Sequence, residues 1–466
     1  MSDNKAIKAG IGYTVANYLI KGLVFFTLPL FTRLLSTSDF GIFNTFLAYE
    51  NILTIILGVS FYSSFNAARF KFNNINKYVS TCITFSIIVT LSFLGLLLIT
   101  YPAYGTNVKI DRWLVALLVA FSFSTAIVTY YNSYVGLYYQ YKKFIAISAI
   151  GAVGNILVSL LLIVTLFSEN RGVGRIVGMS IPSIVLGLFI MGFFFSKEKP
   201  SLQKNYIIFA LIYCLPVIPH SLSQIILNQF DRIMITSMIG ESESGIYSFA
   251  YTLFSILLIT ITSLDKVWGP WFFDNLRLNN YTKIKTRSSQ YGMIMAVLSA
   301  GLLLVAPEII KILGPKEYWE SIYSVIPIVV AGYFSFLYYI PCQVEYYYGK
   351  TKYIAAGSVA AASINIILNL IFIKRFGYIA AAYTTLVSYL LYFLFHYCIS
   401  IRIAGRSLFD TKKIIVMSLS VVACAVVSGL LIDYIWVRWL IAVIVGGTAV
   451  SYYYKQFGIK SLFNKR

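Results

Sequence analysis

The sequence predicts an all-α integral membrane protein with about fourteen transmembrane helices. Of its 466 residues, 59% are hydrophobic and only 12% are charged, and the mean hydropathy is +0.79. Soluble domains carry about 25% charged residues, so lipid is the expected solvent for most of this chain. The apolar residues also gather in stretches long enough to cross a bilayer as helices.

The predicted spans follow one another through most of the chain, separated by short polar loops. Backbone groups in hydrocarbon must be satisfied within the segment, and the alternating pattern of a membrane β-barrel is absent, so these stretches are expected to be helices. The segments are 10–32, 40–65, 78–101, 113–137, 144–167, 174–195, 206–230, 245–264, 290–312, 320–347, 353–373, 377–400, 413–433 and 436–454.

The net charge of +20 is informative about membrane topology, because it comes mostly from Lys and Arg residues in the loops between spans. If the N-terminus is cytoplasmic, most Lys and Arg residues fall in cytoplasmic loops, as the positive-inside rule requires. Both termini are therefore predicted to be cytoplasmic, and nucleic acid is not an expected partner. The five cysteines lie far apart inside apolar stretches, which argues against a disulfide framework or a metal site. Residues 1–9 show no cleavable signal peptide.

Two pairs of segments indicate an internal repeat. The stretch "RLLSTSDFGIFN" (33–44) returns 204 residues later as "SMIGESESGIYS" (237–248). A second pair, 138–163 and 348–373, is identical at nine of 26 aligned positions. Similar apolar helices would match at Ile and Leu, but these pairs also match at Lys, Asn and Ser. Duplication of a six-helix unit is therefore favoured.

A displacement by six spans leaves both copies pointing the same way across the membrane, which makes a parallel repeat. The predicted organisation is an N-terminal six-helix lobe over 1–197 and a second lobe over 198–402. Residues 403–466 add two further helices and a cytoplasmic tail. Such repeats enclose a central site and work by alternating access.

Two ionisable residues lie within the first two predicted spans. Lys21 is near the middle of its span, where a cation costs a few kcal/mol unless it faces a cavity or a partner. It either lines a cationic cavity or extends to an interface. Glu50 either forms a fixed ion pair, for example with Lys21, or carries a coupling ion.

The seventh span, "LPVIPHSLSQIILNQFDR", is unusual. Pro216 and Pro219 are expected to break or kink it. Beyond the prolines, polar residues at a spacing of four indicate a stripe on one face that ends at a charged pair. The stripe either lines a moving gate or forms a polar seam between helices. Its members are His220, Gln224, Asn228, Asp231 and Arg232.

Other polar residues have competing interpretations. Arg33 and Arg69, at opposite ends of the first hairpin, are either interfacial anchors or ligands. Asn155 and Asn365 hold matching repeat positions and favour interhelical hydrogen bonds. Glu345 is expected near a cytoplasmic interface. No phosphate-binding loop, H-E-x-x-H motif or room for a catalytic domain is visible, so we expect neither an enzyme nor a cofactor.

Three stretches resemble a known family. "FFTLPLFTRLLSTSDFGIFNTFLAYENIL", "NQFDRIMITSMIGESESGIYSFAYTLFSIL" and "APEIIKILGPKEYWESIYSVIPIVV" are similar to the polysaccharide-biosynthesis membrane proteins of the O-antigen flippase type. That family belongs to the multidrug, oligosaccharide-lipid and polysaccharide exporter superfamily. The resemblance implies a MATE-like fold and a location in the bacterial inner membrane.

The resemblance also implies a function. The protein would move undecaprenyl-pyrophosphate-linked oligosaccharide across the membrane through a cationic cavity, with Lys21, Arg33 and Arg69 as candidate ligands. The polar stripe of the seventh span would contribute His220, Gln224 and Asn228. Glu50 or Asp231 would couple transport to an ion. Expected partners are membrane lipids, a polysaccharide polymerase and chain-length proteins.

Two other functions are compatible with the same sequence. A cation-coupled antiporter for drugs or small molecules would favour acidic cavity residues, and the mid-span Lys21 argues against it. A polysaccharide polymerase or ligase usually needs a large basic outer loop, which this sequence lacks.

Overall fold

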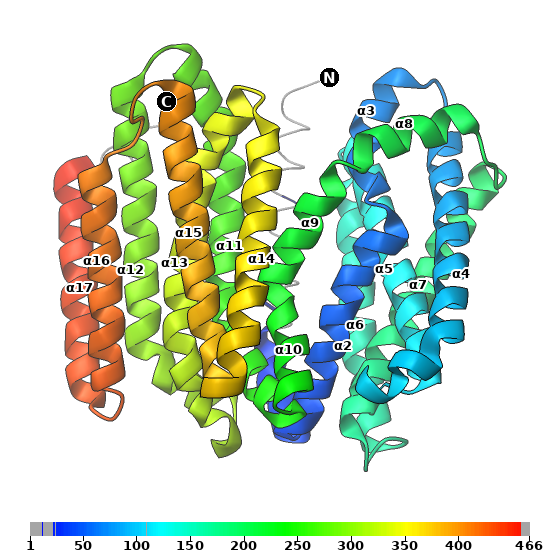
Figure 1. Ribbon diagram of the computed structural model, residues 1–466, viewed down its shortest axis with the longest axis horizontal. Helices are drawn as coiled ribbons and strands as arrows, with labels where there is room; N and C mark the ends of the chain where they lie inside the picture. Colours follow the sequence, from blue (N-terminus) through cyan, green and yellow to red (C-terminus); the bar gives the residue numbers. More distant parts are fainter. Residues whose placement is uncertain (1–11, 13–21, 24, 109, 458–466) are drawn as a thin grey trace. The chain divides into compact units, whose positions relative to one another are not determined.

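The computed structural model describes residues 12, 22–23, 25–108 and 110–457 (Figure 1). Within that part of the chain, eleven helices are long and apolar enough to cross a membrane, and one bent pair makes a twelfth. Two shorter apolar helices, Phe25–Leu34 and Ile435–Thr448, lie at the predicted first and fourteenth spans. The predicted all-α membrane architecture is confirmed.

The chain divides into two compact units, of which the first ends at Gly245. Its core is aromatic: the rings of Phe65 and Tyr130 lie 5.5 Å apart, and the Ser64 hydroxyl is 2.7 Å from that of Tyr78. The elements after Phe25–Leu34 are α2 (Thr37–Gly58), η1 (Phe61–Ser64), α3 (Phe65–Lys71), α4 (Ile75–Val108), α5 (Arg112–Leu137), α6 (Tyr141–Val164), α7 (Arg171–Lys197), α8 (Lys204–Cys214), α9 (Val217–Ile225), the π turn η2 (Ile226–Phe230) and α10 (Asp231–Met238).

The second unit begins at Ile246, inside a helix whose first turn belongs to the first unit. In the span that contains α13, 89% of the residues of an 18-residue apolar stretch are buried. α13 therefore forms the centre of this unit, where it packs along α15. The elements are α11 (Glu241–Arg277), α12 (Tyr281–Leu313), η3 (Lys316–Ser321), α13 (Ile322–Tyr347), α14 (Thr351–Phe376), α15 (Ile379–Ala404), α16 (Thr411–Leu430) and α17 (Ile435–Phe457).

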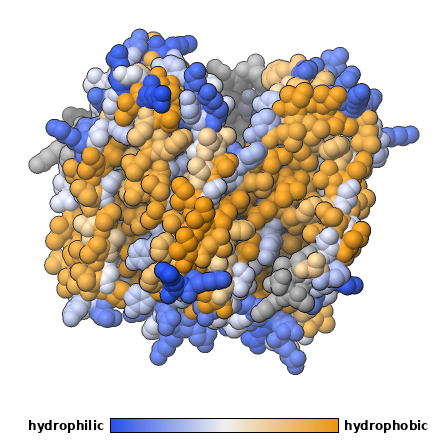
Figure 2. All heavy atoms as spheres, viewed as in Figure 1, coloured by the Kyte–Doolittle hydropathy of each residue, from blue (hydrophilic) through white to orange (hydrophobic). Residues whose placement is uncertain are grey.

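Several helices keep an apolar face outward. In an 18-residue apolar stretch of each helix, only 11% of the residues of α6 and 22% of those of α4 are buried. Most of these side chains are therefore available to lipid. On the face shown in Figure 2, hydrophobic side chains cover the middle of the helices and hydrophilic ones gather near their ends. This distribution suits helices that cross a bilayer.

The second pair of repeated segments, 138–163 and 348–373, has the same backbone conformation in both copies. α5 and α13 each contain 26 residues, and a three-residue loop follows each. Tyr139 and Gly349, which hold matching positions, have positive φ angles of 56° and 66°. The loops also share a hydrogen bond, from Gln140 N to the Val135 carbonyl at 3.0 Å and from Lys350 N to the Glu345 carbonyl at 2.8 Å. These matches support duplication; the lobe boundaries at 197/198 and 402/403 stay predictions.

In the first pair of repeated segments, 33–44 and 237–248, two helices begin at matching positions. α2 begins at Thr37 and α11 at Glu241, 204 residues later. Ser36 caps α2 through a capping box with Asp39, in which each side chain accepts from the other residue's backbone N–H. The Thr37 hydroxyl lies 2.7 Å from that of Ser242. The two copies of the motif therefore contact each other through their first turns.

Glycine permits this contact. A Cβ atom on Gly41 would lie 1.8 Å from the Glu241 carbonyl oxygen, and one on Gly245 would lie 1.9 Å from that of Thr37. Because residues 37 and 41 correspond to 241 and 245, each copy presents the same surface to the other. The contact is self-complementary, like the interface of a symmetric dimer.

Substitution of Gly41 by Ala should destabilise the protein. The added methyl group meets backbone atoms that no rotamer change can move, so we expect the free energy of unfolding to fall by about 3 kcal/mol. The matched control is Gly95→Ala in α4, where an added Cβ has no atom within 4 Å. Thermal unfolding in detergent measures both variants, and equal unfolding temperatures would contradict the proposed close approach.

Candidate functional site

The structure describes all but one of the predicted site residues. Lys21 lies outside the described residues, so its place in a cavity stays a prediction. The others occupy three regions of the first unit: the middle of α2, the broken span α8–α10, and the ends of the helices around the first hairpin.

Glu50 is buried in the interior of the first unit, with 5% of its surface exposed. The Thr54 hydroxyl donates to Glu50 Oε1 at 3.0 Å, and Thr125 of α5 forms a second side-chain hydrogen bond. Hydroxyl groups can satisfy a carboxyl group without adding a counter-charge. Glu50 is thus held between α2 and α5 in an environment that can accommodate a change of charge.

The seventh span is broken, as the prolines predict. α8 ends at Cys214, α9 begins at Val217, and the two parts are bent by 52°. A second irregularity, the π turn Ile226–Phe230, follows α9 and was not predicted. Widened turns of this kind often occur at functional sites.

The π turn separates the predicted polar stripe into two parts. His220 and Gln224 lie on α9, and Asn228 lies in the π turn, where its side-chain amide donates to the Gln224 carbonyl at 2.7 Å. Asp231 is fully buried at the start of α10. Arg232 donates to the Asn228 carbonyl at 2.7 Å and to Gln229 Oε1 at 2.6 Å. The polar residues therefore surround the irregular backbone and satisfy part of it.

Arg33 and Arg69 each bind the carbonyl groups of a helix end. Arg33 donates to the Pro29 carbonyl at 3.0 Å. Arg69 donates to the Leu137 carbonyl at the end of α5, and its guanidinium carbon lies 4.9 Å from the centre of the Tyr138 ring. A cation at a helix C-terminus is favourable, so both contacts have a structural effect.

An arginine inside a helix was not among the predicted site residues. Arg175 lies inside α7, and its guanidinium carbon is 3.7 Å from the centre of the Phe31 ring and 5.0 Å from that of Phe43. It also donates to the Asn155 carbonyl at 3.3 Å. Its position at the second residue of the predicted span 174–195 is the signal that could have identified it.

The second unit contains two acid–base pairs, of which one is fully buried. Arg438 of α17 makes a bidentate contact with Glu308 of α12, at 2.8 Å and 2.5 Å. Glu345 of α13 lies 2.5 Å from His396 of α15, and both side chains are fully buried, although the sequence placed Glu345 near an interface. Among the described residues, no group of three His, Cys, Asp or Glu side chains could hold a metal ion.

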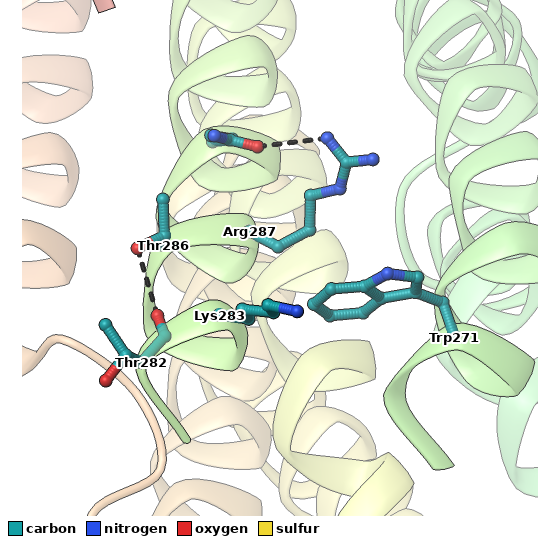
Figure 3. Close-up of a pocket in the computed structure, with 6 residues that line it drawn as sticks. Trp271, Thr282, Lys283, Thr286 and Arg287 are labelled. Atoms are coloured by element: carbon teal, nitrogen blue, oxygen red, sulfur yellow. Dashed lines mark hydrogen bonds between the residues drawn. The ribbon is translucent and has the colours of Figure 1, made fainter. Parts of the chain in front are cut away.

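A basic groove lies between the end of α11 and the start of α12, with a volume of about 250 Å³. Figure 3 shows the Lys283 ammonium and the Arg287 guanidinium on the side of the Trp271 indole. The Arg287 guanidinium carbon is 5.8 Å from the centre of the indole ring, and Arg287 also donates to Gln290 Oε1 at 3.2 Å. Two cations beside an aromatic face can bind an anionic group and stack against a sugar ring.

A second recess of about 190 Å³ lies in the first unit, among α5, α6 and α7. Lys197 lies 4.3 Å from the centre of the Phe193 ring and donates to the Tyr134 hydroxyl at 3.2 Å. The Tyr134 hydroxyl in turn donates to Asn76 Oδ1 at 2.7 Å. Both recesses thus combine aromatic rings with Lys or Arg, and both lie at helix ends that the charge pattern assigns to the cytoplasm.

Comparison with known sequences identifies a family. The family model described as "Polysaccharide biosynthesis protein" matches residues 7–276. A Haemophilus influenzae protein named "Lsg locus putative protein 1" is 22% identical over 386 residues, which cover 77% of this chain and 89% of that protein. The match thus includes most of both chains.

Solved structures show the same fold. The lipid II flippase MurJ, in an inward closed conformation, aligns with a TM-score of 0.71 at 16% identity, covering 96% of this chain and 99% of that one. An inward-facing multidrug resistance MATE family transporter aligns with a TM-score of 0.65 at 14% identity, covering 83% and 94% of the two chains. The predicted MATE-like fold is therefore confirmed.

Arg69→Ala tests the structural effect of this cation. Loss of a charged hydrogen bond to the end of α5 should lower the free energy of unfolding by about 1 kcal/mol, because the Leu137 carbonyl loses its donor. Lys142→Ala, an exposed residue at the start of α6, is the matched control and should have no measurable effect. The measurement is thermal unfolding in detergent. An unchanged Arg69→Ala protein would favour a role for Arg69 in binding instead.

Proposed function

This chain belongs to the polysaccharide biosynthesis protein family, and on that premise we propose that it is a flippase for lipid-linked oligosaccharides. Its substrate would be an undecaprenyl-pyrophosphate-linked repeat unit of O-antigen or a similar surface polysaccharide. The protein would move this unit from the cytoplasmic to the outer leaflet of the bacterial inner membrane without altering it chemically. The family match is the observation that carries the proposal.

The fold supports a transporter of this class. The chain shares its fold with a protein named for flipping lipid II and with multidrug transporters. Transporters built from repeats bind substrate near the bilayer midplane and expose it to each side in turn. The matching helix ends and loops of α5–α6 and α13–α14 support such a repeat.

The chemistry of the substrate fits the cationic and aromatic residues of the chain. A pyrophosphate carries negative charge, its sugars have faces that stack on aromatic rings, and its polyprenyl tail stays in lipid. We propose that Lys283, Arg287 and Trp271 contact the head group at the predicted cytoplasmic end. Lys21, Arg33 and Arg69 remain the proposed ligands in the first lobe, and His220, Gln224 and Asn228 those of the broken span.

Coupling to an ion gradient is part of the proposal. Glu50 is surrounded by hydroxyl donors within a membrane-spanning helix, and Asp231 is fully buried beside the π turn. Ionisable groups placed in this way mark ion pathways in membrane proteins. We further propose that both termini are cytoplasmic and that the product passes to a polysaccharide polymerase and chain-length proteins.

A second candidate function is an antiporter for cationic drugs or small molecules. The buried Glu50 carboxyl favours it, because such a group can attract a cation, and so does the shared fold of the multidrug transporters. The basic groove favours the lipid-linked substrate instead, because two cations repel a cationic drug. The two functions make different predictions for a strain that lacks the protein.

Deletion of the gene should abolish the surface polysaccharide and cause lipid-linked repeat units to accumulate on the cytoplasmic side. Extraction of undecaprenyl-linked sugars and their accessibility to an added glycosidase measure the amount and the side. Complementation with the intact chain is the control. Increased drug sensitivity with normal polysaccharide would support the antiporter, and unpolymerised units on the outer face would support a polymerase.

Removal of the two groove cations should weaken substrate loading. The double variant Lys283→Ala, Arg287→Ala should reduce the rate of repeat-unit translocation at low substrate by about tenfold, which corresponds to about 1.4 kcal/mol. The matched control replaces Lys374 and Arg375, which the charge pattern places on the outer side. Rates are measured in proteoliposomes, and equal losses in both double variants would exclude a specific role for the groove.

A further inference from the structure

The Glu345–His396 pair differs from an ordinary structural ion pair. Its two residues come from the central helix α13 and from α15, and neither side chain has any exposed surface. Glu345 Oε1 lies 2.5 Å from His396 Nδ1. Among the described residues, Glu345 Oε2 and His396 Nε2 have no hydrogen-bond partner. Other buried groups of the described chain, such as the Ser159 hydroxyl and the Trp268 indole N–H, also lack a partner, but here two such atoms belong to one contacting pair of ionisable side chains.

Aromatic and other titratable groups surround the pair. The imidazole ring centre is 4.7 Å from that of Tyr392, 5.2 Å from that of Phe395 and 5.9 Å from that of Tyr338. On the side of α14, Gly357 faces His396 Nε2, and a Cβ there would lie 2.9 Å from it. The titratable groups with an electrostatic or ring contact to the pair, or to its immediate neighbours, are Tyr338, Tyr339, Cys342, Tyr346, Tyr389, Tyr392 and, from α11, Asp265.

The Arg438–Glu308 pair of the same unit shows how a permanent ion pair is held in this protein. Arg438 makes two hydrogen bonds to Glu308 and donates further to the carbonyls of Leu431 at 2.9 Å and Leu304 at 2.6 Å. An arginine stays charged throughout the physiological range, so this pair exchanges no proton. Its donors are also satisfied, unlike His396 Nε2.

Burial makes the number of protons on the Glu345–His396 pair critical. With two dissociable protons shared between carboxyl and imidazole, the pair has no net charge. With one, it has a net negative charge in a region of aromatic side chains, and burial of an unpaired charge is very costly. The closed site therefore favours the neutral state, and loss of the proton requires that water reach the pair.

We propose that Glu345 and His396 form a binding site for one exchangeable proton, loaded from water and released to water as the protein changes conformation during transport. The proton resides on the Oε1–Nδ1 contact, and its departure leaves a carboxylate beside a neutral imidazole. The site couples translocation to a proton gradient, and it rests on the proposed transport function. It would act in the second unit, apart from Glu50 and Asp231 in the first.

The proton site can be tested without substrate, because the chain has only two histidines, His220 and His396. His220→Gln leaves a single imidazole, which is labelled with ¹⁵N and observed by NMR in lipid nanodiscs. We expect the ¹⁵N signals of His396 to show both states of the pair, with and without the shared proton, as the pH of the buffer is changed. Signals of a single state at every pH at which the protein stays folded would overturn the proposal.

Variants of the acidic partner connect the two states to Glu345. Glu345→Gln preserves the shape but removes the carboxylate, so the imidazolium would be an uncompensated buried charge and only one state should be seen. Glu308→Gln is the matched control and should keep both states. If Glu345→Gln keeps both states, Glu345 does not share the proton. The spectra of the intact Glu345–His396 pair remain a test even if Glu345→Gln fails to fold.

A transport measurement separates this inference from the proposed function. Proteoliposomes containing lipid-linked oligosaccharide should translocate it faster under an imposed pH gradient. In Glu345→Gln this stimulation should be reduced by about tenfold or more, whereas Glu308→Gln should keep it. Translocation that ignores the gradient would overturn proton coupling while the flippase function stands. Both states of the pair in the NMR spectra, without any translocation of this substrate, would overturn the flippase function while the proton site stands.

Discussion

The close approach of two helix starts is the constraint on which the first unit depends. α2 and the first turn of α11 approach until the backbone atoms of one would meet any side chain on Gly41 or Gly245 of the other. Hydroxyl contacts continue this interface: Thr37 with Ser242, and Thr45 with Thr236 at 2.6 Å. In lipid, where apolar surface alone does not drive association, small residues and hydroxyl groups are what hold helices together. The motif repeated at 33–44 and 237–248 is thus a packing surface used twice.

The same physical rule governs the buried polar groups elsewhere. A polar side chain in an apolar helix must find a partner, and most do: Asn369 donates to Asn365 Oδ1 at 3.3 Å, and Ser428 donates to the Leu303 carbonyl at 2.6 Å. Asn365 itself donates to the Thr385 hydroxyl of α15 at 3.3 Å, which is consistent with its predicted role in interhelical hydrogen bonding. The Glu345–His396 pair differs because both of its members are ionisable and fully buried, and ionisable groups inside membrane proteins mark functional sites.

The broken seventh span links backbone irregularity to polar chemistry. Pro216 removes a backbone donor at the bend, and the π turn displaces the hydrogen bonds of residues 226–230. The polar side chains of this segment satisfy part of the freed backbone, as Asn228 and Arg232 show. Proline signals a break in the sequence, but a π turn has no comparable residue signature. Its position depends on how neighbouring helices pack, so the sequence could predict the bend and not the π turn.

The sequence by itself determined the membrane class, the positions of the helices, the bend of the seventh span and the two repeated motifs. These properties follow from hydropathy, proline chemistry and local identity, which act over short distances along the chain. Only the tertiary structure decided which polar residues meet. Glu345 and His396 are 51 residues apart, and Glu308 and Arg438 are 130 apart. Pairing at that distance depends on which faces of the helices pack together, and an apolar helix offers few sequence differences between its faces. For the same reason the contact of Arg175 with Phe31 could not be predicted from the sequence.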